Sequence, residues 1–113
     1  MKKIEATIRP SRMYAVREAL AVFGINEMTI VEVGGSSRRN GQPVPDINGN
    51  WRQDFQPKIK LEFVVDDAVC GPVCRGISHA AGTGGLGDGN IFISQVEEAI
   101  RIRADEADQL AVC

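Results

Sequence analysis

The clearest capacity for chemistry lies in residues 82–90, which read GTGGLGDGN and include five glycines. Glycines let backbone N–H groups approach a phosphate closely and form an anion-binding nest. The Gly-Lys-Ser/Thr ending of a P-loop is absent, and a plain turn explains the segment equally well. Arg101 and Arg103 would lie on one face of a strand, where paired guanidinium groups suit phosphate. A solvated strand face is the alternative for these arginines.

The other reactive side chains are three cysteines and one histidine. Cys70 and Cys74 have the i, i+4 spacing of one helical face, which could serve a metal ion or a thiol switch. Two thiols without further ligands at matching spacing make a poor zinc site, so buried core residues are favoured. The third cysteine, Cys113, makes the count odd and leaves open whether the three form a redox switch. His79 has no recognisable partner, and no catalytic constellation is found.

The stretch from residue 34 to residue 58 is rich in glycine and proline, which oppose both helix and sheet. Its apolar residues follow neither a strand nor a helix period. We therefore expect a long loop, of a kind that is usually functional or disordered. Trp51, the only tryptophan, and Arg52 would be exposed there for a partner.

Strands and helices must position these residues. Alternating or β-branched patterns predict strands over 4–8, 29–33, 59–65 and 91–94, and a short last segment over 100–103. An apolar face predicts a first helix with Ser11 as its cap and Gly24 at its end. A second helix is predicted over about 68–81, beginning near Pro72 or kinked there, because proline opposes a helix interior.

The order βαβ-loop-βαβ predicts an α+β ferredoxin-like βαββαβ sandwich over residues 1–113, a single domain. Two helices cover one face of such a sheet, so a homo-oligomer is expected. The chain has 113 residues, 43% of them hydrophobic, and a net charge of -2. These values favour neither nucleic-acid binding nor membrane insertion, and without a signal peptide they point to the cytoplasm.

Taken together, five segments resemble the P-II signal-transduction proteins over nearly the whole chain. They are MKKIEATIRP, GINEMTIVEVGG, DFQPKIKLEFVV, GTGGLGDGNIF and IRIR. The resemblance implies a homotrimer that binds ATP, ADP or AMP in clefts between subunits. Residues 36–56 would be the T-loop that contacts a target, residues 82–90 the B-loop, and residues 104–113 the C-terminal tail.

The resemblance also implies roles for individual residues. Adenine would be surrounded by Thr29, Glu62 and Val64, with Gly35 beside it. The phosphates would be cradled by Ser37, Arg38, Gly87, Asp88 and Gly89, with Asn90 at the same end. Arg101 and Arg103 would add charge from the neighbouring edge of the cleft.

Departures from the family pattern are equally informative. Trp51 replaces the tyrosine that is uridylylated in the family, and Gly49 replaces a serine phosphorylated in some relatives. Arg39 replaces a glutamine that helps to hold magnesium and 2-oxoglutarate, which makes a magnesium site doubtful, whereas Lys58 is kept. Asn90 replaces a phosphate-binding lysine, which favours ADP or AMP over ATP.

The resulting hypothesis is a non-enzymatic regulator of a membrane transporter or an enzyme, from a divergent P-II-like branch. By analogy with that branch, it could sense bicarbonate through Arg39 and Lys58 and act near a carboxysome. Two alternatives stay open. One is a weak nucleotide hydrolase in which Asp88 activates water, and the other is a metal-binding trimer of the copper-tolerance type that uses Cys70 and Cys74.

Overall fold

The computed structural model describes residues 1–36, 44–45, 51–52, 55–102 and 106–107. Its elements are β1 (Lys2–Ile8), a 3-10 turn η1 (Pro10–Arg12), α1 (Met13–Ala21), β2 (Thr29–Ser36), β3 (Val44–Pro45), β4 (Trp51–Arg52), β5 (Phe55–Val65), α2 (Asp67–Ala81), β6 (Gly89–Gln95), β7 (Ile100–Arg101) and β8 (Glu106–Ala107).

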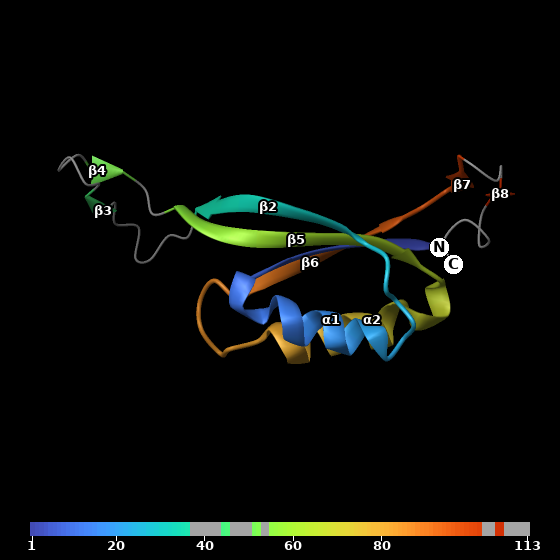
Figure 1. Cartoon of the computed structure of the whole chain (residues 1–113), viewed down its shortest axis with the longest axis horizontal. Coiled ribbons are helices and arrows are strands. Elements are labelled where there is room, and N and C mark those ends of the chain that lie inside the picture. The colour runs from blue at the N-terminus through green and yellow to red at the C-terminus, as the bar shows by residue number, and fades with distance from the viewer. Residues whose placement is uncertain (37–43, 46–50, 53–54, 103–105, 108–113) are drawn as a thin grey trace.

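Four of the strands form one sheet in the order β2-β5-β1-β6, and all neighbours are antiparallel. Helices α1 and α2 lie side by side against one face of this sheet, and the other face carries no element among the described residues (Figure 1). This is the predicted α+β ferredoxin-like arrangement. Two further two-residue ladders, β3-β4 and β7-β8, lie outside the sheet.

The core lies between the helices and the covered face. Because side chains alternate along a strand, every second residue of β5 from Ile59 to Val65 is buried, as predicted. The helices complete the core with the residues of their inner faces. These are Val16 and Leu20 from α1, and Cys70, Val73, Ile77 and Ala81 from α2. None of the helices in the described part of the chain is long and apolar enough to span a membrane.

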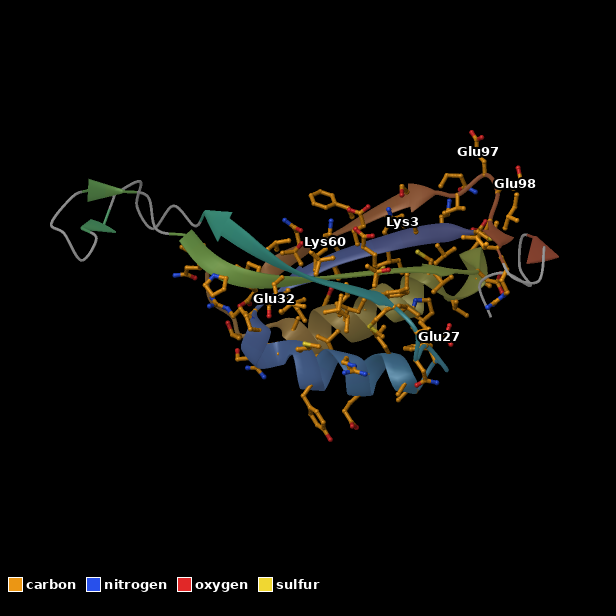
Figure 2. The ribbon with its side chains drawn as sticks, turned by 45° about the horizontal axis from the view of Figure 1, so that its top comes forward. Lys3, Glu27, Glu32, Lys60, Glu97 and Glu98 are labelled. Atoms are coloured by element: carbon orange, nitrogen blue, oxygen red, sulfur yellow. The ribbon has the colours of Figure 1, made fainter. Side chains whose placement is uncertain are left out.

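The other face of the sheet carries charged side chains at its centre, where Lys3 and Lys60 stand away from the helices (Figure 2). Lys60 Nζ lies 2.8 Å from a Glu62 carboxylate oxygen, and Lys3 Nζ lies 3.0 Å from Glu5. Ion pairs at such a solvated surface contribute little to stability. Phe92, on the same face, is 62% exposed.

The prediction that residues 34–58 avoid sheet structure is wrong at both ends. Strand β2 continues to Ser36 and β5 begins at Phe55, with Gly34 paired to Pro57. Since β1 ends at Ile8, opposite Ile59, β2 is the only partner of β5 beyond that point among the described residues, and proline is tolerated at such an edge. Residues 37–43, 46–50 and 53–54 of the predicted T-loop lie outside the described residues.

Two helix boundaries also differ from prediction. Ser11 lies inside η1 and caps nothing, because α1 begins only at Met13. Helix α2 begins at Asp67, close to the predicted residue 68, and runs through Pro72, so the alternative start near that proline is wrong. Cys70, which lies before Pro72, is only 7% exposed, and its burial favours the helix against the unfavourable proline. The predicted end of the first helix is confirmed by the left-handed Gly24, with a φ of 76°.

Candidate functional site

One end of the sheet carries an open cleft of about 660 Å³ that gathers four of the predicted nucleotide-binding residues. Thr29 on β2 and Glu62 on β5 are direct cross-strand partners, and Val64 follows two residues later. The rest of the wall comes from three places. They are the connection that enters β2 (24–28), Phe63 on β5, and the residues around β7 (99–101), which include Arg101.

This cleft suits a flat apolar ring with polar edges. Val64 and Ile100 supply apolar surface, and Thr29 supplies a hydroxyl. A hydrogen bond from Lys60 holds the pKa of the Glu62 carboxyl below its ordinary value, so this group is an acceptor at neutral pH. Arg101 brings a cation to the same cleft. A nucleobase and its ribose could be recognised here by apolar contact, acceptors and donors together.

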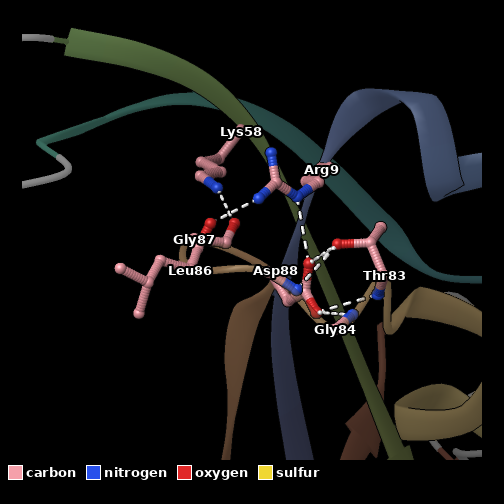
Figure 3. Close-up of polar contacts among 8 residues, drawn as sticks. Arg9, Lys58, Thr83, Gly84, Leu86, Gly87 and Asp88 are labelled. Atoms are coloured by element: carbon pink, nitrogen blue, oxygen red, sulfur yellow. Dashed lines mark hydrogen bonds and ion pairs between the residues drawn. The ribbon is translucent and has the colours of Figure 1, made fainter. Parts of the chain in front are cut away.

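The glycine-rich loop, residues 82–90, is organised around the Asp88 carboxylate (Figure 3). Asp88 Oδ2 accepts from the backbone N–H groups of Thr83 at 2.8 Å and Gly84 at 3.1 Å. Oδ1 accepts from the Thr83 hydroxyl and lies 3.1 Å from Arg9 Nε, with which it forms an ion pair. These donors, the Thr83 hydroxyl first, hold the pKa of Asp88 far below its ordinary value of 3.8. Asp88 is therefore a fixed anion that stabilises the loop.

Two cations from the neighbouring strands hold the tip of the same loop. The Arg9 guanidinium donates to the Leu86 carbonyl, and the Lys58 ammonium donates to the Gly87 carbonyl. Lys58 is only 7% exposed. Arg9 was missed by sequence reasoning, although the predicted topology held a signal for it. In a ferredoxin-like sheet the end of the first strand lies beside the start of the last strand, and therefore beside the loop that precedes it.

Gly89 joins this loop to β6 at a point that admits no side chain. Its φ is 117°, and a Cβ there would lie 1.8 Å from the carbonyl oxygen of Thr7 on β1. The loop therefore enters the sheet in direct backbone contact with the strand that provides Arg9.

The predicted nucleotide-binding residues that the structure describes thus form two main groups, which lie at opposite ends of the sheet (Figure 1). The cleft group contains Thr29, Glu62, Val64 and Arg101. The loop group contains Gly87, Asp88 and Gly89, and Asn90 follows on β6 opposite Thr7. Gly35 pairs with Gln56 on the β2-β5 ribbon beyond the loop. Ser37, Arg38, Arg39 and Arg103 lie outside the described residues, and the structure gives Trp51 and Arg52 only a backbone pairing, in β4.

Cys70 and Cys74 belong to the core and its edge, and Cys113 lies outside the described residues. Cys70 is buried, and burial raises the pKa of the Cys74 thiol to about 11. Both groups are free thiols. In the described ranges, no three side chains of the His, Cys, Asp and Glu types gather as metal ligands would. A protonated thiol is a weak ligand and nucleophile, so packing explains this pair better than metal binding.

The protein is a small α+β domain with an open cleft at one end of its sheet and a braced glycine-rich loop at the other. Comparison with known proteins identifies the family. Residues 1–106 match the sequence profile of the family described as Nitrogen regulatory protein P-II. The chain is 45% identical to the "Nitrogen regulatory protein P-II" of Haemophilus influenzae over 112 residues, which cover 99% of this chain and 100% of that protein. It is 43% identical to the "Nitrogen regulatory protein P-II 1" of Escherichia coli K12 over the same coverage.

A solved structure agrees with the sequence comparisons. The crystal structure of Arabidopsis thaliana PII bound to citrate matches with a TM-score of 0.79 and 32% identity, covering 98% of this chain and 88% of that chain. The chain belongs to the P-II family of nitrogen regulatory proteins. It is accordingly a regulatory signal-transduction protein.

The Asp88 network predicts an unusual titration. Because the folded pKa is depressed, the network stabilises the loop fully above pH 3.8 and loses this effect as the pH falls through the folded pKa. We expect the Asp88 carboxyl to stay ionised at about pH 3, measured by carbon-detected NMR. Thr83→Val should raise the pKa of Asp88. Thr29→Val, the same substitution at the cleft end of the sheet, should leave the pKa of Asp88 unchanged. An ordinary pKa in the unmodified protein would contradict this description of the loop.

Gly89→Ala should destabilise the fold by more than about 2 kcal/mol, because it adds left-handed strain to a backbone collision. Gly34→Ala is the matched control, since a Cβ there meets nothing within 4 Å and its φ is not positive. The control should stay within about 0.5 kcal/mol of the parent in urea unfolding. Equal free energies of unfolding for the two variants would show that the close contact to Thr7 is not rigid.

Proposed function

We propose that this P-II family member binds an adenine nucleotide between neighbouring copies of the chain, in a homotrimer, and thereby controls a membrane transporter or an enzyme. The nucleobase occupies the cleft of one copy, and the phosphates occupy the glycine-rich loop of the next. ADP and AMP bind at least as well as ATP. The protein acts without catalysis, through the loop at 36–56 and its Trp51 and Arg52.

The observation that carries this proposal is the separation of the two groups. Thr29, Glu62, Val64 and Arg101 line the cleft at one end of the sheet, whereas residues 82–90 lie at the other end (Figure 1). A nucleotide whose base fills the cleft of one copy and whose phosphates reach the loop of the next copy would use both groups. A second copy packed on the uncovered sheet face would bring its loop to the cleft, and a closed ring would repeat this contact at each interface.

The loop suits phosphate oxygens through its backbone more than through its side chains. The Asp88 charge is paired with Arg9 and hydrogen-bonded within the loop, so it repels an anion less than a free carboxylate would. Asn90 provides an amide where the family places a lysine. Arg38, Ser37 and Arg103 would complete the phosphate end, together with Arg101 from the neighbouring cleft.

A small anion such as bicarbonate is proposed as a second effector, with Arg39 and Lys58 as its ligands. The Lys58 ammonium is already bonded to the Gly87 carbonyl, so this anion would share a donor with the loop. That arrangement would couple anion binding to the loop that holds the phosphates. A guanidinium at position 39 repels magnesium, so we propose binding without a strong requirement for this ion.

Two alternative functions, a nucleotide hydrolase and a metal-binding trimer, are each disfavoured by one observation. A general base needs a pKa near the working pH, and the pKa of Asp88 is held far below its ordinary value. This disfavours Asp88 as the group that activates water in a hydrolase. The metal-binding alternative relies on Cys70 and Cys74, and burial raises the pKa of the latter thiol.

Mixed oligomers test the shared site. Thr29→Arg should block the cleft, and Asn90→Asp should repel phosphate from the loop, so each variant alone should bind ADP poorly. After the two variants are co-refolded, random mixing in a closed ring should restore about a quarter of the sites, each built from two intact halves. Calorimetry measures the recovered sites. A mixture that binds no more ADP than its parents would contradict a site shared between copies.

The nucleotide preference tests the role assigned to Asn90. A charged hydrogen bond contributes about 1.5–3 kcal/mol, so the missing lysine should weaken binding of the terminal phosphate by tenfold or more. ADP and AMP should therefore bind at least as tightly as ATP, and Asn90→Lys should shift the ranking toward ATP. Asn90→Gln is the matched control, because it adds length without charge. A tenfold preference for ATP in the unmodified protein would refute this assignment.

A further inference from the structure

The tip of the glycine-rich loop is held from one side by two cations. Arg9, which follows β1, donates to the Leu86 carbonyl, and Lys58 on β5 donates to the Gly87 carbonyl (Figure 3). The Arg9 side chain is also held at its Nε, 3.1 Å from Asp88 Oδ1. One guanidinium therefore links the tip of the loop to the carboxylate that organises its base.

The direction of these two carbonyls fixes the direction of the next two N–H groups. No peptide bond in the described chain is cis, and in a trans peptide the C=O and N–H point in opposite directions. Since the carbonyls of Leu86 and Gly87 face the cations, the N–H groups of Gly87 and Asp88 face away from them. Two successive N–H groups on one side of a turn form the concave donor pair that binds anions.

The fit between the cations and the loop depends on glycine. A Cβ at Gly87 would lie 3.4 Å from Arg9 Nη2 and 3.5 Å from Lys58 Nζ, and the φ of this residue is 85°. A Cβ at Gly85 would lie 3.7 Å from Arg9 Nη2. The loop backbone thus lies directly against the guanidinium, and the orientation of its amides is sensitive to that group.

We propose that Arg9 is a positioning residue for anion binding. It holds the loop carbonyls inward and so aims the N–H groups of Gly87 and Asp88 at the phosphates, which it does not contact itself. Lys58 supports the same arrangement from the neighbouring strand. The inference rests on the proposed nucleotide site for its ligand, whereas the orientation of the loop can be measured without any ligand.

The variant Arg9→Met removes the charged donors and keeps much of the side-chain volume. Arg9→Lys retains one donor, and Arg17→Met makes the same exchange at an exposed residue of α1. Amide hydrogen exchange of the ligand-free proteins should be at least about tenfold faster over residues 83–88 in Arg9→Met, a factor that corresponds to about 1.4 kcal/mol. Arg17→Met should match the parent, and Arg9→Lys should lie between them. The amides of β5 serve as the internal control for folding.

Binding of ADP and of adenosine, which lacks phosphate, separates positioning from general destabilisation. In NMR titrations, Arg9→Met should weaken the affinity for ADP by about tenfold or more. It should change the affinity for adenosine by less than about twofold. Equal losses for both ligands, or a weakened ADP affinity with unchanged loop exchange, would overturn the positioning role. If the unmodified protein binds neither ligand, the proposed function fails, and the exchange rates alone still decide whether Arg9 orders the loop.

Discussion

A four-stranded sheet with two helices can bury only one of its faces. In this chain, Ile4, Leu61 and Phe63 point toward the helices and form the core, while Lys3, Lys60 and Glu62 occupy the other side. The placement of the candidate site follows from this constraint. The cleft and the glycine-rich loop lie at opposite ends of the sheet, and in the proposed function they meet through a second copy. Assembly and ligand binding would then depend on the same surface.

The loop illustrates how a flexible composition becomes an ordered element. Five glycines in residues 82–90 carry a large entropic cost of ordering. The Asp88 carboxylate offsets this cost with donors from Thr83, Gly84 and Arg9. A loop ordered before its ligand arrives loses less entropy on binding, and this favours affinity for small anions. The same network keeps Asp88 ionised and therefore removes it from acid-base chemistry.

The main sheet was predictable because its strands alternate in hydrophobicity or are rich in β-branched residues, whereas the two-residue strands β3, β4 and β8 were not predicted. The β5 positions from Ile59 to Val65 and the left-handed Gly24 are where the pattern places them. Local rules left two starts open for α2, at residue 68 or near Pro72, and the helix takes the earlier one, with Cys70 buried ahead of the proline. The length of β2 and β5 was underestimated for a similar reason. Pairing between two strands continued through Gly34 and Pro57, whose own propensities oppose it.

The cleft part of the candidate site was predictable only through the resemblance to a family, whereas the composition of residues 82–90 indicated the loop directly. Thr29, Glu62 and Val64 share no local motif, and they meet because β2 and β5 pair in one register. Arg9 was missed because its role depends on backbone carbonyls of the loop, which carry no side-chain signature in the sequence. Contacts of this kind follow from topology, and they become visible only when the strands are placed side by side.

Whether one chain alone can hold a nucleotide is decided most directly by the ADP affinity of a monomeric form. Phe92→Asp places a charge on the uncovered face at a side chain that is 62% exposed, so it should prevent assembly without disturbing the core. Sedimentation would establish the mass, and calorimetry the affinity. The shared site predicts a folded monomer that binds ADP at least about a hundredfold more weakly than the parent, although every nucleotide-binding residue is present. A monomer that binds ADP as tightly as the assembled protein would contradict it.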